Sequence, residues 1–124
     1  MVKKLTVKDI LERKKLVEKE KPNYYYSKTL KGNIDIVDVS PDRIVNIVNA
    51  ADNTEPIRAN CEVIYECCPI FQDKELIESC EVKDPILVVQ KCFCNNVFEI
   101  DELAKIILSR YGYNSESIEQ VKKQ

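Results

Sequence analysis

The chain has 124 residues, of which 44% are hydrophobic and 32% are charged, and its net charge is −2 with a pI of about 5.3. These values are typical of a globular protein, and a chain of this length forms one domain that can bury a hydrophobic core. No stretch approaches the roughly 20 uninterrupted apolar residues of a membrane span, and the amino-terminal residues lack the apolar segment of a secretory signal. We therefore expect a soluble cytoplasmic protein with no membrane partner.

The charge is unevenly distributed along the chain. Residues 1–21 hold eight Lys/Arg and four Asp/Glu, a net charge of +4, which leaves −6 on the remaining residues. A general nucleic-acid-binding protein usually shows a dense basic patch and a high pI. Because the basic end has mixed charge and the rest is acidic, we expect no nucleic-acid partner.

Six cysteines occur without any histidine. They are Cys61, Cys67, Cys68, Cys80, Cys92 and Cys94. Without a secretory context, free thiols are favoured over a disulfide framework, and the spacings lack the two-residue gap that is typical of zinc sites. Free cysteine is among the most buried residue types, so we expect these side chains to fill the core. A metal site and a reactive thiol are the alternatives.

The amino-terminal segment predicts a helix. Thr6 is followed three residues later by Asp9, as at a helix start, and a partial apolar stripe then continues to about residue 19. Lys14 interrupts this stripe. We therefore expect the helix to lie at the edge of the domain.

A β-hairpin is predicted next. Residues 24–30 and 34–39 indicate two strands around a turn at 31–33, and the first strand begins with three consecutive tyrosines. Aromatic side chains in strands mostly serve packing, so we expect one or two of these tyrosines to pack under the hairpin. An exposed recognition stripe is the alternative.

The rest of the chain predicts helices. Residues 41–51 and 56–68 each open on a proline and repeat apolar residues at three- and four-residue steps. Residues 73–80 predict a short helix, and the segment that opens at Asp84-Pro85 predicts a central, enclosed one. A last helix follows the break at 95–96 and carries Ile100, Leu103, Ala104, Ile107 and Tyr111. Gly112 has the conformational freedom to close it.

The predicted fold is therefore mainly α, with about six helices in a compact bundle-like domain and a small β-hairpin near the N-terminus. This single domain spans residues 1–113. Residues 114–124 are polar and predict a tail that is frayed or that orders on a partner.

Catalytic and cofactor motifs are missing from the sequence. With Gly32 and Gly112 as the only glycines, neither a Walker loop nor a dinucleotide fingerprint can be written. Without histidine, a His-based triad is also excluded. We expect no enzyme and no cofactor; a carboxylate pair or a cysteine nucleophile is the alternative.

An acidic cluster stands out instead. It consists of Glu62, Glu66, Asp73, Glu75, Glu78 and Glu81, opposed within that span only by Lys74. Such a cluster is typical of a solvated face, and a docking surface for a basic partner is the functional alternative.

A family resemblance rests on short motifs distributed along the chain. They are the runs 64–69 (IYECCP) and 73–76 (DKEL), then 84–85 (DP) leading to 88–89 (VV), then 98–100 (FEI) and 111–113 (YGY). With these motifs the chain resembles the XkdN-like phage tail assembly chaperones. The similarity covers most of the chain, because the preceding helices and hairpin fall in the expected order.

The resemblance implies a function in the assembly of phage tails, prophages or tail-like bacteriocins. Such chaperones coat the long tape measure protein in the host cytoplasm, keep it soluble until the tail tube polymerises, and are absent from the finished particle. The tape measure protein is the implied partner, with the tail tube protein and self-association as further ones. Tyr65, Ile70 and Phe71 are the candidate contact residues on this reading, and each is equally a candidate for the core.

The alternative from another class is a small helical DNA-binding regulator. Residues 73–80 and the helix from Pro85 would then form a helix-turn-helix pair. The second helix is nearly all apolar, with only Gln90 and Lys91 available to contact bases. This pattern favours the chaperone interpretation.

Overall fold

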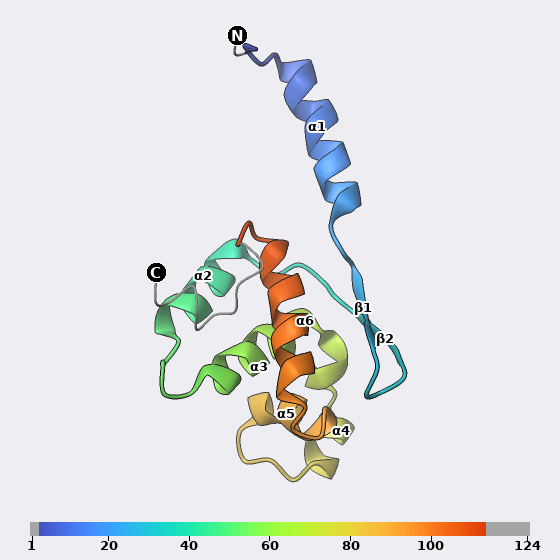
Figure 1. The fold of residues 1–124 in the computed structure, drawn as a ribbon, viewed down its shortest axis with the longest axis vertical. Helices are drawn as coiled ribbons and strands as arrows, with labels where there is room; N and C mark the ends of the chain where they lie inside the picture. Colours follow the sequence, from blue (N-terminus) through green and yellow to red (C-terminus); the bar gives the residue numbers. More distant parts are fainter. Residues whose placement is uncertain (1–2, 114–124) are drawn as a thin grey trace.

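The computed structural model describes residues 3–113 and confirms the mainly α fold with a small hairpin (Figure 1). In chain order the elements are α1 (Val7–Glu20), β1 (Tyr24–Ser27), β2 (Gly32–Asp35), α2 (Pro41–Ala50), α3 (Pro56–Cys67), the 3-10 helix η1 (Pro69–Gln72), α4 (Lys74–Ser79), the 3-10 helix η2 (Pro85–Leu87), α5 (Val88–Cys92) and α6 (Val97–Ser109). The predicted polar tail, 114–124, lies outside the described residues.

The core forms where α3 and α6 pack against each other, with the shorter elements around them (Figure 1). The largest fully buried side chains on these two helices are Val63, Ile64, Ile100, Leu103, Ile107 and Leu108. Beside them, the rings of Phe71 and Phe93 lie with their centroids 5.7 Å apart at a tilt of 43°. The apolar periodicity of both helices is therefore used to build one continuous core.

The hairpin is shorter than predicted, and its turn comes earlier. Ser27 pairs with Gly32, so the turn occupies residues 28–31 instead of 31–33. The Ser27 hydroxyl accepts the backbone N–H of Leu30 at 3.0 Å, which closes the turn. As expected, one tyrosine packs under the hairpin: Tyr25 is buried, whereas its two neighbours are exposed.

Buried Glu99 joins the hairpin to the first turn of α6. Its carboxylate accepts the Ser27 hydroxyl, and it accepts the Thr29 hydroxyl at 2.5 Å. Asn96 caps α6 by accepting the Glu99 N–H at 3.1 Å and donates to the Thr29 hydroxyl at 3.2 Å. Each of these polar groups has a partner, so a buried carboxylate is tolerated here.

The predicted central helix from Pro85 is broken into two short pieces, η2 and α5. Asp84 begins the segment by accepting the Ile86 N–H at 3.2 Å. The segment ends at Cys94 and Asn95, whose φ angles of 53° and 63° are left-handed. An α-helix cannot continue through that conformation.

Two expectations for this half of the chain have opposite outcomes. Gly112 closes the chain after α6 with φ of 89°, as predicted. The cysteines are free thiols, and those at 61, 67 and 68 are buried as expected. Cys94 is exposed, so its placement in the core was wrong; the left-handed turn carries its side chain to the surface.

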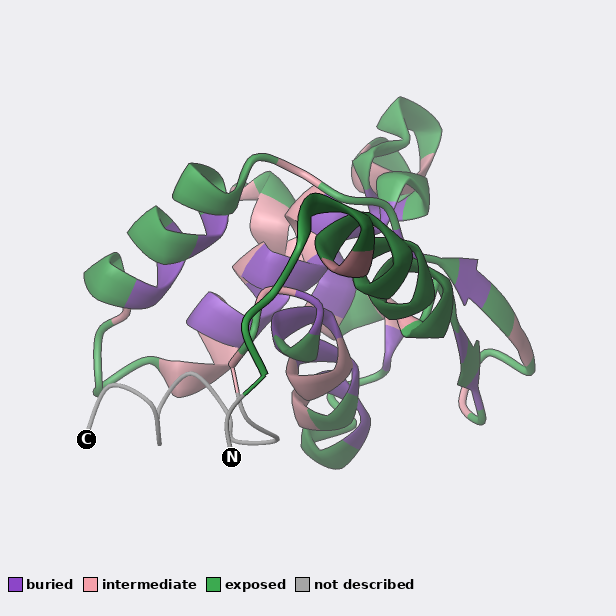
Figure 2. Cartoon of the chain, turned by 90° about the horizontal axis from the view of Figure 1, so that it is seen from above, coloured by how far each residue is buried: buried purple, intermediate pink, exposed green. Residues whose placement is uncertain are grey.

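Helix α1 projects from the rest of the molecule (Figure 1). It has 14 residues and none of them is buried. Figure 2 shows α1 exposed nearly all round, whereas α2, α3, α5 and α6 each bury residues on their inner faces. We predicted α1 at the edge of the domain, and the structure places it even farther out, with no residue buried.

Candidate partner-binding surface

Helix α1 presents apolar side chains that nothing covers among residues 3–113. Four of them, Val7, Ile10, Leu11 and Val17, recur on one side of the helix, and we call this set the α1 stripe. Their exposed fractions run from 41% to 75%. Lys14 interrupts the stripe, but exposed apolar residues gathered on one side of a helix, unlike isolated ones, mark an interaction site.

The helix itself is well defined by local interactions. The Thr6 hydroxyl accepts the Asp9 N–H at 3.2 Å, and the Asp9 carboxylate accepts the Thr6 N–H at 3.0 Å, which forms a capping box. This backbone hydrogen bond, with help from Lys3, lowers the pKa of Asp9. Farther along, Lys14 lies 2.8 Å from Glu18 and lowers the pKa of that carboxyl.

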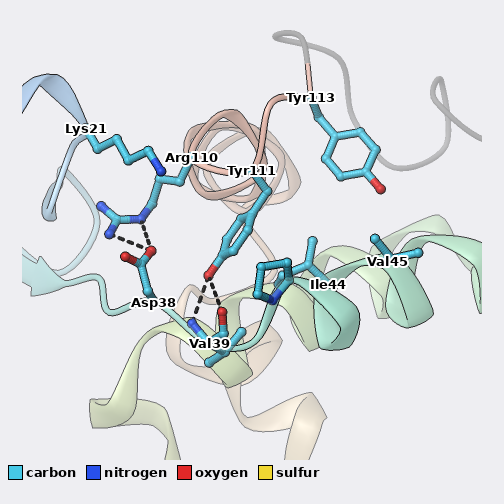
Figure 3. A pocket seen from close by; sticks show the side chains of 9 residues that line it. Lys21, Asp38, Val39, Ile44, Val45, Arg110, Tyr111 and Tyr113 are labelled. Atoms are coloured by element: carbon cyan, nitrogen blue, oxygen red, sulfur yellow. Dashed lines mark hydrogen bonds and ion pairs between the residues drawn. The ribbon is translucent and has the colours of Figure 1, made fainter. Parts of the chain in front are cut away.

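The base of α1 is held by a buried arginine that directly follows α6 (Figure 3). The guanidinium of Arg110 donates to the Pro22 carbonyl and to Asp38, at 2.7 and 3.0 Å for the two bonds to the carboxylate. One residue beyond Pro22, the Asn23 carbonyl accepts the Ile36 N–H at 2.9 Å. We call α1 the arm and the remaining described residues the body. Specific hydrogen bonds therefore form the joint between arm and body.

Tyr111 lies beside Arg110 after the end of α6 and binds the segment between β2 and α2 (Figure 3). Its hydroxyl accepts the Val39 N–H at 2.8 Å and donates to the Val39 carbonyl at 3.3 Å. Burial raises the pKa of Tyr111. A hollow of about 490 Å³ opens beside these residues and reaches Lys21 at the end of the arm.

The three predicted apolar contact residues have different surroundings. Ile70 is 58% exposed and available to a partner, and Tyr65 is half-buried against the core. Phe71 is only 2% exposed, because its ring packs on Phe93. Its assignment as a contact residue was therefore wrong.

The predicted acidic cluster is divided between two parts of the fold. On α3, Glu66 forms an ion pair with Arg43 of α2, and Glu62 lines a hollow between these two helices. Three further carboxylates lie at α4: Asp73 caps it by accepting the Leu76 N–H at 3.1 Å, Glu75 is exposed, and Glu78 lies 4.0 Å from Lys74. Glu81 lies in the turn after α4 and is exposed. Ion pairing or capping therefore accounts for three of the six carboxylates, Glu66, Asp73 and Glu78.

The buried thiols are poor nucleophiles. Burial raises the pKa of Cys61 and of Cys68 to about 12, and that of Cys67 to about 11. The thiolate is the reactive form, so these groups stay protonated and inert near neutral pH. Within residues 3–113, no cluster of three or more potential ligands could hold a metal ion.

The proposed helix-turn-helix pair gains no support from the fold. Helix α4 has six residues and α5 has five, and Val88 and Val89 of α5 are buried. A recognition helix must place several polar side chains in the major groove, for which α5 is too short and too enclosed.

Among the described residues, no helix combines the length and apolar character needed to cross a membrane.

Sequence reasoning detected the α1 stripe but missed its importance. Nine of the 14 residues of α1 are charged, and Leu16 lies on the side opposite the stripe. With so many charged side chains, little of the helix surface is apolar enough to be buried in a core. It was the available signal that α1 would remain outside the body.

Comparisons of the chain with protein-family models, with curated proteins and with solved structures found no match.

Proposed function

We propose that this protein is a tail assembly chaperone of a phage, prophage or tail-like particle. In this proposal it binds the tape measure protein in the host cytoplasm, keeps it soluble until the tail tube polymerises, and is absent from the mature particle. The role requires no catalytic step and no cofactor. The observation that carries the proposal is the α1 stripe, exposed on a helix that leaves the body.

The stripe suits a long, partly apolar helical partner. An amphipathic helix binds another by laying its apolar face on that of the partner, with anchors at three- and four-residue steps. Each apolar side chain that becomes covered contributes at about 25 cal/mol per Å² of surface removed from water. Covering the stripe would also protect the partner from aggregation.

The size of the arm favours reversible binding. A helix of 14 residues is roughly 21 Å long, and one face of it is smaller than the roughly 800 Å² that each partner buries in a standard stable interface. Modest contacts repeated by many copies along one partner give overall affinity without making any single copy hard to displace. Tube subunits could then replace the copies one at a time.

The test is co-expression with the tape measure protein encoded nearby, followed by size-exclusion chromatography with light scattering. We expect several copies on a partner that is otherwise insoluble. Absence of a complex, with the tape measure protein still insoluble, would contradict the proposal. The same assay shows whether the tail tube protein joins the complex or whether the chain self-associates without a partner.

Two matched variants locate the contact. Ile10→Asp places a charge in the α1 stripe, and Phe98→Asp places one on an apolar residue of α6 that is even more accessible. In the native chain Ile10 is 53% exposed and Phe98 is 77% exposed. We expect only Ile10→Asp to lose the complex. Equal losses would remove α1 from the proposed role.

A further inference from the structure

The charged residues that border the α1 stripe are asymmetrically arranged. Lys8, Lys15 and Lys19 recur at steps of seven and four residues, so they line one side of the stripe, next to Leu11. We call these three residues the lysine edge. Glu12 lies on the same side, which leaves a net charge of +2 there. The other side of the stripe carries Asp9, Arg13 and Glu20, with a net charge of −1.

Among residues 3–113, little neutralises the lysine edge. Lys8 lies 4.0 Å from Glu12, at the limit of an ion pair. No carboxylate among residues 3–113 lies within ion-pair distance of Lys15 or Lys19, and both are exposed. A row of positive charge that is only partly paired, beside an apolar surface, selects partners of opposite charge and repels those of like charge.

From this arrangement we propose that α1 takes a partner helix of defined chemistry: an amphipathic helix with an apolar stripe and a row of acidic residues along one edge. The inference rests on the proposed function and specifies the tape measure segment that α1 would cover. The apolar stripe supplies the contact area, and the lysine edge pairs with the acidic row. Because only one side of the α1 stripe is basic, the pairing also fixes how the partner lies across it.

A second copy of α1 fits this surface less well. In an antiparallel pair of α1 helices, the basic run 13–15 at the middle of one helix would face the same run of the other. Like charges in such positions are destabilising. We therefore expect the free chain to be a monomer in light scattering.

The test uses the full chain and three synthetic helical peptides with the same leucine stripe. Their flanking positions carry glutamate, glutamine or lysine. We expect the glutamate peptide to bind about 3- to 10-fold tighter than the glutamine peptide, as two or three exposed ion pairs allow, and the lysine peptide to bind weakest. The differences should shrink at 1 M salt, where the screening length falls to about 3 Å.

Charge reversal on the protein provides the matched control. Lys15→Glu with Lys19→Glu should reverse the order of the peptides, whereas Lys28→Glu with Lys83→Glu, which changes net charge equally on the body, should leave it intact. Circular dichroism checks that each variant keeps its helical content. Equal affinity for the three peptides, or an unchanged order in the first variant, overturns the inference.

The outcomes separate this inference from the proposed function. If the peptide order holds but the tape measure protein is not solubilised, the acidic helix belongs to another partner. If the free chain dimerises and Lys15→Glu with Lys19→Glu dissociates the dimer, the face belongs to a second copy, and the inference fails.

Discussion

Helices α1 and α6 are nearly equal in length, with 14 and 13 residues, yet only α6 contributes to the core. Helix α6 buries six of its residues, whereas α1 buries none. Both begin with a side-chain cap, from Thr6 and from Asn96. Local helix signals are therefore equivalent, and they do not determine which helix enters the core.

Composition accounts for the difference. Helix α6 has eight apolar and four charged residues, and α1 has five apolar and nine charged ones. Burying α6 removes a wide apolar face from water, whereas burying α1 would also require desolvating several charges. The comparison shows that a stripe too narrow for the core can remain available for a partner.

The largest expected effect separates a core aromatic residue from a surface one. Phe71→Ala should destabilise the protein by about 3–5 kcal/mol, because it removes a buried ring that packs on Phe93. Phe98→Ala, at a side chain that is 77% exposed, should change stability by no more than about 0.5 kcal/mol. Urea unfolding followed by circular dichroism measures both. A small loss for Phe71→Ala would contradict the described core.

Alkaline pH should also weaken the body. The pKa of Cys61 and of Cys68 is raised by burial to about 12 and that of Cys67 to about 11, whereas unfolded thiols titrate near 9. The unfolded chain therefore loses these protons first, so this stability is present below about pH 9 and is lost as pH rises toward the folded values. At pH 10 the expected loss is about 1.4 kcal/mol for each buried thiol.

Urea midpoints at pH 8 and pH 10 measure this loss. Cys68→Ala should make the loss of stability between pH 8 and pH 10 smaller by the contribution of one buried thiol, about 1.4 kcal/mol. Cys94→Ser, at an exposed thiol, should leave the loss unchanged. The same loss in all three proteins would show that other groups cause it.

The joint between arm and body gives a smaller effect. Arg110→Met should cost about 1–3 kcal/mol, because the Pro22 carbonyl and Asp38 lose their charged donor. Arg43→Met removes an exposed ion pair with Glu66 and should cost at most about 1 kcal/mol. Small-angle scattering should also show a broader range of arm positions for Arg110→Met alone. An unchanged scattering profile would mean that Arg110 does not orient α1.

Much of this fold could be predicted from the sequence because its signals are local. The apolar spacing on α3 and α6 and the proline at the first position of α2 depend only on neighbouring residues. The hairpin turn was misplaced because its position depends on Glu99, which lies 72 residues from Ser27. No local pattern reports such a contact.

The candidate site was harder to predict for the same reason. Whether Ile70 or Phe71 faces solvent depends on where the ring of Phe93 lies. Likewise, Glu66 is paired only because α2 brings Arg43 beside it. The α1 stripe stays exposed because no other element packs on it, and this can be seen only in the assembled fold.

The smallest expected effect on stability is the most informative for the comparison. Ile10→Ala removes a stripe residue of α1 that is 53% exposed, so stability should change by no more than about 0.5 kcal/mol. Ile100→Ala, at a fully buried position of α6, should cost about 2–5 kcal/mol. Urea unfolding of the two variants gives the comparison directly. A loss above about 1 kcal/mol for Ile10→Ala would show that α1 packs against another part of the chain, and the stripe would then not be free for a partner.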